Sequence, residues 1–242
     1  MTRYSFLSLL LAWALLSAPA HAVDAYSAEP IEAWVIDAET NKPIEGVIVT
    51  ANWELSYGTA GGSVSHGQMM VMECVTDKEG RFYFPAWGPK PIPSFSVPAR
   101  DAQEALYLSV FPIELHLVNR DPALLLFKRD YKYLALVNQF TTNYNKGSLR
   151  RSQWNGKTIK MERFKGTMEE YVRHLSFLMG GLRFIEDDCQ WKKTPRMLMA
   201  LQEQADIFKA SGIVSDIYRI DFLPTDEKKC GSVKEYFRRY QQ

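Results

Sequence analysis

Serine and histidine side chains are the first candidates for chemistry in this chain, because a histidine can take the proton of a serine nucleophile. Ser65 and His66 are adjacent in the stretch GGSVSHG, and His174 lies far downstream. Neighbouring side chains of an extended segment point to opposite faces, so Ser65 and His66 cannot pair with each other. The stretch also lacks the Gly-x-Ser-x-Gly elbow of many hydrolases. A hydrolase site would therefore need folding to bring Ser65 and His66 together with His174 or Asp188.

The spacing of the other ligand types does not indicate a metal or nucleotide site. No histidine falls in an H-E-x-x-H or paired-cysteine pattern of the kind that holds zinc. Asp37, Glu39 and Asp77 could hold calcium, but they lack the close ligand spacing of an EF-hand loop. The stretch WNGKT matches the end of a phosphate-binding loop, but Arg151 stands where the first glycine is needed. We expect no metal and no cofactor.

Positive charge is concentrated between residues 146 and 166, where Glu162 is the only acidic residue. This basic segment could bind an anionic partner such as lipid head groups or a wall polymer. The competing interpretation is a solvated connector whose charge pairs with the acidic run Glu186 to Asp188. Asn155-Gly156 is typical of a tight turn, so we expect a hairpin between Ser152–Trp154 and Lys157–Met161.

Tryptophans could add a platform on which sugar rings stack. Trp53 lies on the apolar side of an alternating stretch and is expected in the core, whereas Trp191 is two residues from Cys189, as expected for a ring packed on a disulfide. Trp87, in the loop PAWGPKPIP, is the best candidate for an exposed ring. The candidate ligand-binding residues are Lys146, Arg150, Arg151, Trp154, Lys157, Lys160 and Trp87.

The elements that must position these residues are strands in the first half of the chain. From residue 31 to about 119, apolar and polar residues alternate, which is typical of half-buried strands. Turn residues separate the strands and no helical period intervenes, which favours an antiparallel β-sandwich at residues 23–145. A polar loop is expected from Gly58 to Gly67. The expected strands are Ile31–Ile36, Gly46–Leu55, Met69–Thr76, Arg81–Phe84, Ala105–Phe111, Glu114–Val118 and Ala123–Phe127.

Beyond the connector at 146–166, the apolar period becomes helical, and residues 167–242 are expected to form a small α-helical region. The fold class is therefore α+β. Each expected helix begins at a capping signature: Thr167 with Glu170, Thr194 with Pro195, and Ser232 with Glu235.

Two glycine-bearing turns show a resemblance to a known family. They lie in AWVIDAETNKPIEGVIVTA, from Ala33 to Ala51, and TDKEGRFYF, from Thr76 to Phe84. Together they resemble the carboxypeptidase regulatory-like domains, which are related in shape to transthyretin (prealbumin) and to B-type repeats of surface proteins. The matching positions are Asp37, Thr40, Pro43, Ile44, Gly46, Val47, Val49, Ala51, Thr76, Asp77, Gly80 and Phe82.

The resemblance extends over Ile31 to about Leu134, because LLLFKRDYKYL is similar to the family's late strand, with Asp130 where a glycine is usual. It implies a prealbumin-like sandwich that serves as an accessory scaffold and carries no catalytic domain. We accordingly interpret the turns as features that set hairpin register. Gly80 can adopt a positive φ, and Asp77 can accept hydrogen bonds from nearby backbone N–H groups.

The first 22 residues have the features of a signal peptide. Arg3 precedes the apolar run Phe6 to Leu16, and Ala20-His21-Ala22 offers a small-x-small cleavage site. The run is shorter than the roughly 20 residues that span a bilayer, although an uncleaved anchor is the alternative. We expect cleavage after Ala22, a periplasmic or secreted bacterial protein, and no transmembrane segment afterwards.

The three cysteines fit export into an oxidising compartment, where one bridge and one leftover thiol are expected. Cys189 and Cys230 share the helical region, so we predict that they form a disulfide, while Cys74 lies in an expected strand. The 29 basic and 28 acidic residues nearly balance, which gives no reason to expect a nucleic acid partner.

These features favour a non-enzymatic binding or assembly module of the cell envelope, with an envelope protein or polymer as partner. A hydrolase with Ser65, His66 and His174 is one alternative. A structural subunit that pairs through an exposed edge strand is the other.

Overall fold

The computed structural model describes residues 25–59, 62–93, 115–117, 121–137, 152–186, 189–223 and 226–240. The signal peptide, the expected strand Ala105–Phe111, and the candidate residues Lys146, Arg150, Arg151 and Asp188 lie outside these ranges.

The described strands form three sheets. A short one pairs β1 (Ala25–Ala28) with β6 (Trp87–Pro91). A three-stranded sheet has the order β10-β2-β5, with bounds Thr158–Met161, Ile31–Asp37 and Arg81–Phe84. The large sheet has the order β4-β3-β8-β9, and β7 also pairs with β3; the bounds are β3 Ile48–Thr59, β4 Gly62–Val75, β7 His116–Leu117, β8 Ala123–Phe127 and β9 Leu134–Leu136.

The main core lies between the three-stranded sheet and the large sheet, as the alternating sequence predicts. Val47, Val49, Ala51 and Trp53 are each no more than 1% exposed and belong to one cluster with Phe82 and other residues of the facing sheet. The antiparallel sheets and the helices that follow them confirm the expected α+β class.

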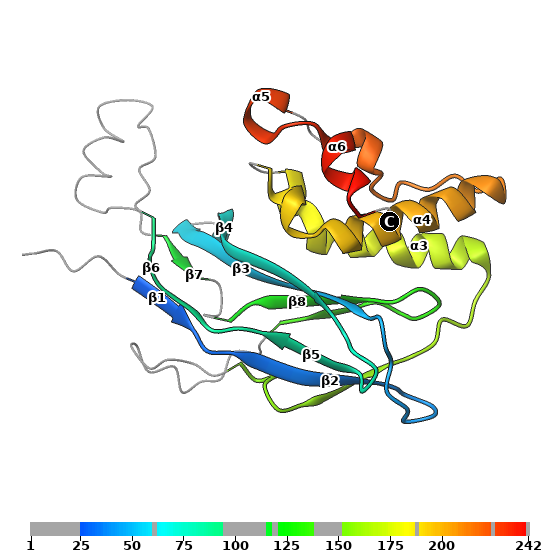
Figure 1. Cartoon of the computed structure of the whole chain (residues 1–242), viewed down its shortest axis with the longest axis horizontal. Coiled ribbons are helices and arrows are strands. Elements are labelled where there is room, and N and C mark those ends of the chain that lie inside the picture. The colour runs from blue at the N-terminus through cyan, green and yellow to red at the C-terminus, as the bar shows by residue number, and fades with distance from the viewer. Residues whose placement is uncertain are drawn as a thin grey trace, which may run out of the picture.

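The helices form a second layer on the other face of the large sheet, and Figure 1 shows them stacked above β3, β4 and β8. Val71, Leu125 and Phe127 of the sheet belong to one buried cluster with Leu175 and Leu198 of the helices. The large sheet is therefore buried on both faces. The helical elements are α3 (Met168–Leu178), η2 (Met179–Glu186), η3 (Gln190–Lys193), α4 (Pro195–Ala210), η4 (Ile220–Phe222), α5 (Glu227–Cys230) and α6 (Val233–Arg238).

The expected helix starts are present, but they are capped in different ways. Thr167 and Glu170 form a reciprocal capping box, and Ser232 accepts a hydrogen bond from the backbone of Glu235. Thr194 precedes α4, yet its side chain makes no cap hydrogen bond. The first turn of α4 must therefore obtain its acceptor from elsewhere.

The acidic turns do not set hairpin register as expected, because the first links β2 to β3 and the second links β4 to β5, and each link joins strands of two different sheets. Their carboxylates instead hold the turns through hydrogen bonds. The Asp37 carboxylate accepts hydrogen bonds from the backbone N–H groups of Glu39 and Thr40, from the Tyr131 hydroxyl and from the Arg163 guanidinium. These donors, the Thr40 backbone first, lower the pKa of Asp37 well below its ordinary value. Its oxygens thus join β2 to the turn after β8 and to the segment after β10.

Two expected connections differ in the structure. The polar loop expected from Gly58 to Gly67 is mostly strand, because β3 continues to Thr59 and β4 begins at Gly62. Asn155-Gly156 does form a turn, with φ of 73° at Gly156, but no strand precedes it.

The hairpin expected around this turn is therefore wrong. Instead, β10 pairs in parallel with β2, because Ile159 and Met161 alternate into the core and complete the open edge of that sheet. The second half of the basic segment is thus part of the sandwich.

Gly80 gives a direct test of the turn between β4 and β5. Its φ is 73°, and a Cβ placed there would lie 2.4 Å from the carbonyl oxygen of Val35. We predict that Gly80→Ala lowers the free energy of unfolding by at least about 2 kcal/mol, measured by urea denaturation. Gly58→Ala is the control, because nothing lies within 4 Å of the added carbon and its φ is not positive. Equal losses in the two variants would contradict the prediction.

Candidate functional site

The structure does not bring the candidate hydrolase residues together. Ser65 pairs with Ser56 on the β3–β4 hairpin, and the ring of His66 lies 6.0 Å from that of Tyr57. His174 of α3 contacts Tyr133, which follows β8 at the opposite end of β3. Eight residues of extended strand, roughly 25 Å, separate those two ends. The serine and the distant histidine are therefore too far apart to form a catalytic pair.

His174 has a structural role at the junction between the sandwich and the helices. Its Nε2 accepts a hydrogen bond from the backbone N–H of Tyr133 at 3.1 Å, and its ring packs against Phe164. Burial, assisted by the positive charge of Lys132, lowers the pKa of His174 below its ordinary value of 6.5. The neutral ring is required because protonated Nε2 could not accept this bond.

The cations of the basic segment that the structure describes are largely committed to intramolecular contacts. Arg163 pairs with Asp37 at 3.1 Å, Lys165 pairs with Glu39, and Lys160 Nζ lies 3.2 Å from Asn41 Oδ1. The sequence also suggested that these cations pair with the acidic run Glu186 to Asp188. Glu186 is the described member of that run, and its carboxylate accepts a hydrogen bond from the Tyr218 hydroxyl instead. Lys157 remains exposed.

Trp87 is not the exposed ring that its loop suggested. It opens β6, and its ring packs 5.2 Å from that of Tyr26 and 5.3 Å from that of Trp53. Trp154 is likewise partly buried against the sandwich core. Both tryptophans therefore contribute to the packing of the β-sandwich.

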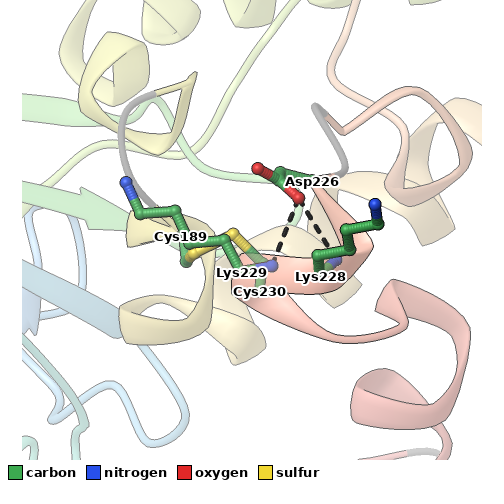
Figure 2. The surroundings of a disulfide bond; sticks show 5 residues. All are labelled: Cys189, Asp226, Lys228, Lys229 and Cys230. Carbon is green, nitrogen blue, oxygen red and sulfur yellow. Dashed lines mark hydrogen bonds between the residues drawn. A yellow bond between two sulfur atoms is a disulfide. The ribbon is translucent and has the colours of Figure 1, made fainter.

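The predicted disulfide is present. Cys189 and Cys230 are bonded, with their Cα atoms 5.4 Å apart. Figure 2 shows the bridge beside α5, whose first turn is capped by Asp226 through the backbone N–H groups of Lys228 and Lys229. The bridge ties the residue before η3 to the end of α5, immediately ahead of α6.

A groove of about 460 Å³ lies where η3 and the start of α4 meet the edges of β4 and β5. We call it the cationic groove. One wall comes from the sheets and the other from the helical layer. Its lining residues are Val71, Met72, Glu73, Tyr83, Phe84, Pro85, Lys192, Lys193, Pro195, Arg196 and Tyr240.

Positive charge dominates this groove. Lys192, Lys193 and Arg196 line it, and within the described chain no carboxylate lies within ion-pair distance of any of them. Lys192 is held over the rings of Trp191, 5.4 Å away, and Tyr236, 5.9 Å away. These aromatic contacts position the ammonium group without neutralising its charge.

Among the described residues, Glu73 is the one acidic member of the lining, and its carboxylate is already engaged. It accepts hydrogen bonds from the backbone N–H groups of Arg196 at 2.9 Å and Met197 at 2.8 Å. Glu73 of the sheet therefore supplies the cap that the Thr194 side chain does not give to α4. Burial raises the pKa of Glu73, and the two backbone donors partly offset this.

Aromatic side chains complete the groove. Tyr83 of β5 is 47% exposed and Tyr240 is 37% exposed, so solvent reaches both side chains. Tyr236 anchors the wall behind them, because its hydroxyl donates to the backbone oxygen of Lys192 at 2.5 Å. The arrangement can bind an anionic group through its cations and a flat ring through its tyrosines.

Sequence reasoning did not select these residues, although a local signal existed. Lys192, Lys193 and Arg196 lie within seven residues of Cys189, beside the tryptophan expected to pack on the disulfide. The larger run of charge at 146–166 outweighed this short cluster. What no local pattern could show is that Tyr83 and Tyr240 lie in the same groove.

Comparison with known proteins gives no family. No family model and no curated protein matches the chain. Among solved structures, 3-chlorocatechol 1,2-dioxygenase from Rhodococcus opacus 1CP has a TM-score of 0.28 at 14% identity, covering 60% of this chain and 62% of the enzyme. A 9R-lipoxygenase from Cyanothece PCC8801 has a TM-score of 0.22 at 13% identity, covering 75% of this chain and 28% of the enzyme. The chain spans less than two thirds of either structure, and scores of this size support no inference.

The membrane question has a partial answer. In the ranges that the structure describes, no helix is long and apolar enough to cross a bilayer.

The hydrogen bond of His174 predicts a specific pH dependence. Because the pKa of His174 is lower in the folded state than its ordinary value, the stabilisation is present above pH 6.5 and is lost as the pH falls below it. We predict that His174→Gln removes this part of the pH dependence of urea denaturation. His66→Gln, a change far from the junction, is the control and should preserve it. Identical pH profiles for wild type and His174→Gln would contradict the assignment.

The disulfide should contribute substantially to stability. Replacing Cys189 and Cys230 by serine is expected to lower the free energy of unfolding by about 4 kcal/mol, because it releases the constraint on a loop of this length. Urea denaturation with and without reductant measures the effect. In a Cys74→Ala control, the sensitivity to reductant should persist.

Burial raises the pKa of Cys74 to about 12, so this thiol should resist alkylation until the protein unfolds.

Proposed function

We propose that this protein is an exported, non-enzymatic binding module that holds an anionic ligand of the bacterial cell envelope in its cationic groove. The observation that carries the proposal is the convergence of Lys192, Lys193 and Arg196 in a groove where Glu73, the one acidic residue among the described lining, caps a helix. By contrast, Ser65 and His66 lie on the β3–β4 hairpin, whereas His174 lies on α3 and contacts Tyr133 near the opposite end of β3.

The disulfide supports both the export and the binding role. Disulfides persist mainly in oxidising compartments, which agrees with the signal peptide that the first 22 residues suggest. The Cys189–Cys230 bridge also holds η3, which carries Lys192 and Lys193, against the segment that continues into α6 and Tyr240. It therefore fixes two parts of the helical wall of the groove.

The chemistry of the groove points to an acidic or phosphorylated saccharide. Ammonium and guanidinium groups bind carboxylates and phosphates, and the guanidinium can do so in a two-pronged manner. Exposed tyrosine rings pack well against flat, partly apolar sugar faces. A volume of about 460 Å³ falls in the range of small-molecule sites, so the groove suits a short stretch of a polymer.

The β-sandwich favours a scaffold role for the strands rather than a catalytic one. Its turns resemble those of carboxypeptidase regulatory-like domains, which serve as scaffolds on many proteins. The Asp37 and Asp77 carboxylates accept backbone hydrogen bonds within their turns. Pairing through the edge of β4 is less favoured, since Lys90 already bonds the backbone oxygen of Met69 there.

A charge-removal experiment tests the proposal. The triple variant Lys192→Ala, Lys193→Ala, Arg196→Ala should bind immobilised heparin, a sulfated and carboxylated saccharide, at least about tenfold more weakly than wild type. The loss should shrink as salt rises, because the attraction is screened. Phosphatidylglycerol vesicles serve as a second probe that separates a lipid surface from a saccharide.

The matched control removes two cations from the basic segment, Lys157→Ala with Lys160→Ala. It should retain most of the heparin affinity, while circular dichroism and thermal melting confirm that both variants fold. Wild-type affinity in the triple variant, or a larger loss in the control, would contradict the assignment of the groove. Stronger binding to vesicles than to heparin would redirect the proposal to lipid head groups.

A further inference from the structure

A second pocket, of about 220 Å³, lies where the start of α3 meets the second half of α4 and the turn after β8. Figure 1 shows α3 and α4 running side by side over the large sheet. The pocket shares none of the residues of the cationic groove. Its walls are mainly aromatic and aliphatic, with Phe164, Tyr171, Ile207 and Phe208 among the lining residues.

Gln204 is the unusual member of this lining. It is 3% exposed, and its amide makes no hydrogen bond to the described residues, yet neither amide atom is among their fully enclosed polar atoms that lack a partner. The amide therefore reaches the open space of the pocket that it lines, where water or a ligand can pair with it. The neighbouring Gln202 shows the usual arrangement, because its amide bonds Asp206 and the backbone of Ile220.

Two other polar side chains of the pocket add hydrogen-bond donors, beside the acidic Asp130 of the lining. The Tyr171 hydroxyl accepts from the backbone N–H of Asp130 at 3.1 Å, which leaves its own proton available. Burial raises the pKa of Tyr171 to about 12, so that proton is retained at neutral pH. Arg129 lies at the exposed side, where its Nε is 3.8 Å from the Asp130 carboxylate.

The apolar part of the pocket suits a flat ring. The ring of Tyr171 lies 4.8 Å from that of Phe164 and 6.0 Å from that of Phe208. These are ordinary distances for aromatic packing, and a third ring could extend the cluster. A volume of about 220 Å³ is below the usual range for drug-sized ligands, which limits the occupant to a small molecule.

We propose that this pocket binds a small aromatic ligand with one carbonyl or carboxylate group. The Gln204 amide and the Tyr171 hydroxyl donate to that group, and the rings of Phe164 and Phe208 pack against its body. The assignment is independent of the cationic groove, since it uses different residues and a different ligand chemistry.

Benzamide and benzoate are suitable probes, because each joins one ring to one acceptor group, and toluene is the probe without an acceptor. Ligand-observed NMR on the full chain measures their affinities. Wild-type protein should bind benzamide or benzoate more tightly than toluene. The Gln204→Leu variant is similar in size but lacks the amide. It should bind benzamide and benzoate at least tenfold more weakly than wild type does.

Gln202→Leu is the matched control on the same helix. It should melt at a lower temperature than wild type, because it removes three hydrogen bonds within the protein, and it should keep the affinity for the probes. Gln204→Leu should melt at about the wild-type temperature, because the amide makes no hydrogen bond to the described residues and reaches the open pocket.

Two results would overturn the proposal. One is that wild-type protein binds neither benzamide nor benzoate more tightly than toluene. The other is that Gln204→Leu retains the wild-type affinity. A fall in the melting temperature of Gln204→Leu together with either result would assign the amide a purely structural role.

Discussion

The large sheet must be covered on both faces, and the rest of the structure depends on this constraint. Along β3, the residues that point away from the sandwich core are also withdrawn from solvent; Thr50, for example, is 1% exposed. Leu125 and Phe127 of β8 present apolar side chains to the same outer face. Exposing that face would cost about 25 cal/mol for each Å² of apolar surface, so the fold needs the helices to bury this face.

Contacts at the edges of this interface explain why a groove forms where it does. Glu73 reaches from β4 to cap α4, and His174 reaches from α3 to the backbone beside β9. The groove lies beside the Glu73 contact, and side chains of both layers line it. A junction of this kind collects residues that are remote in sequence, which is why Tyr83 and Arg196 share one lining.

Local signals in the sequence predicted the local parts of the structure. The alternation from Val47 to Trp53 identified the buried face of β3, and Thr167 with Glu170 identified the start of α3. Even Asp130, which replaces a glycine in the resembled pattern, has the positive φ of 66° that favours glycine. The parallel pairing of β10 with β2, the meeting of Lys192 with Tyr83 in one groove and the pocket position of Gln204 were not predictable, because each depends on contacts between segments far apart in the chain.

A site shared by two layers has an energetic consequence. A ligand that bridges the lysines of η3 and Tyr83 of β5 contacts both layers at once, so it can bind fully only when the helices are docked on the sheet. Ligand binding and docking must then stabilise each other by mass action. The disulfide lies within the helical layer and keeps η3 in place whether or not a ligand is bound. The helical layer thus keeps the cations in position on one wall of the groove, and docking of the helices against the sheet supplies the other wall.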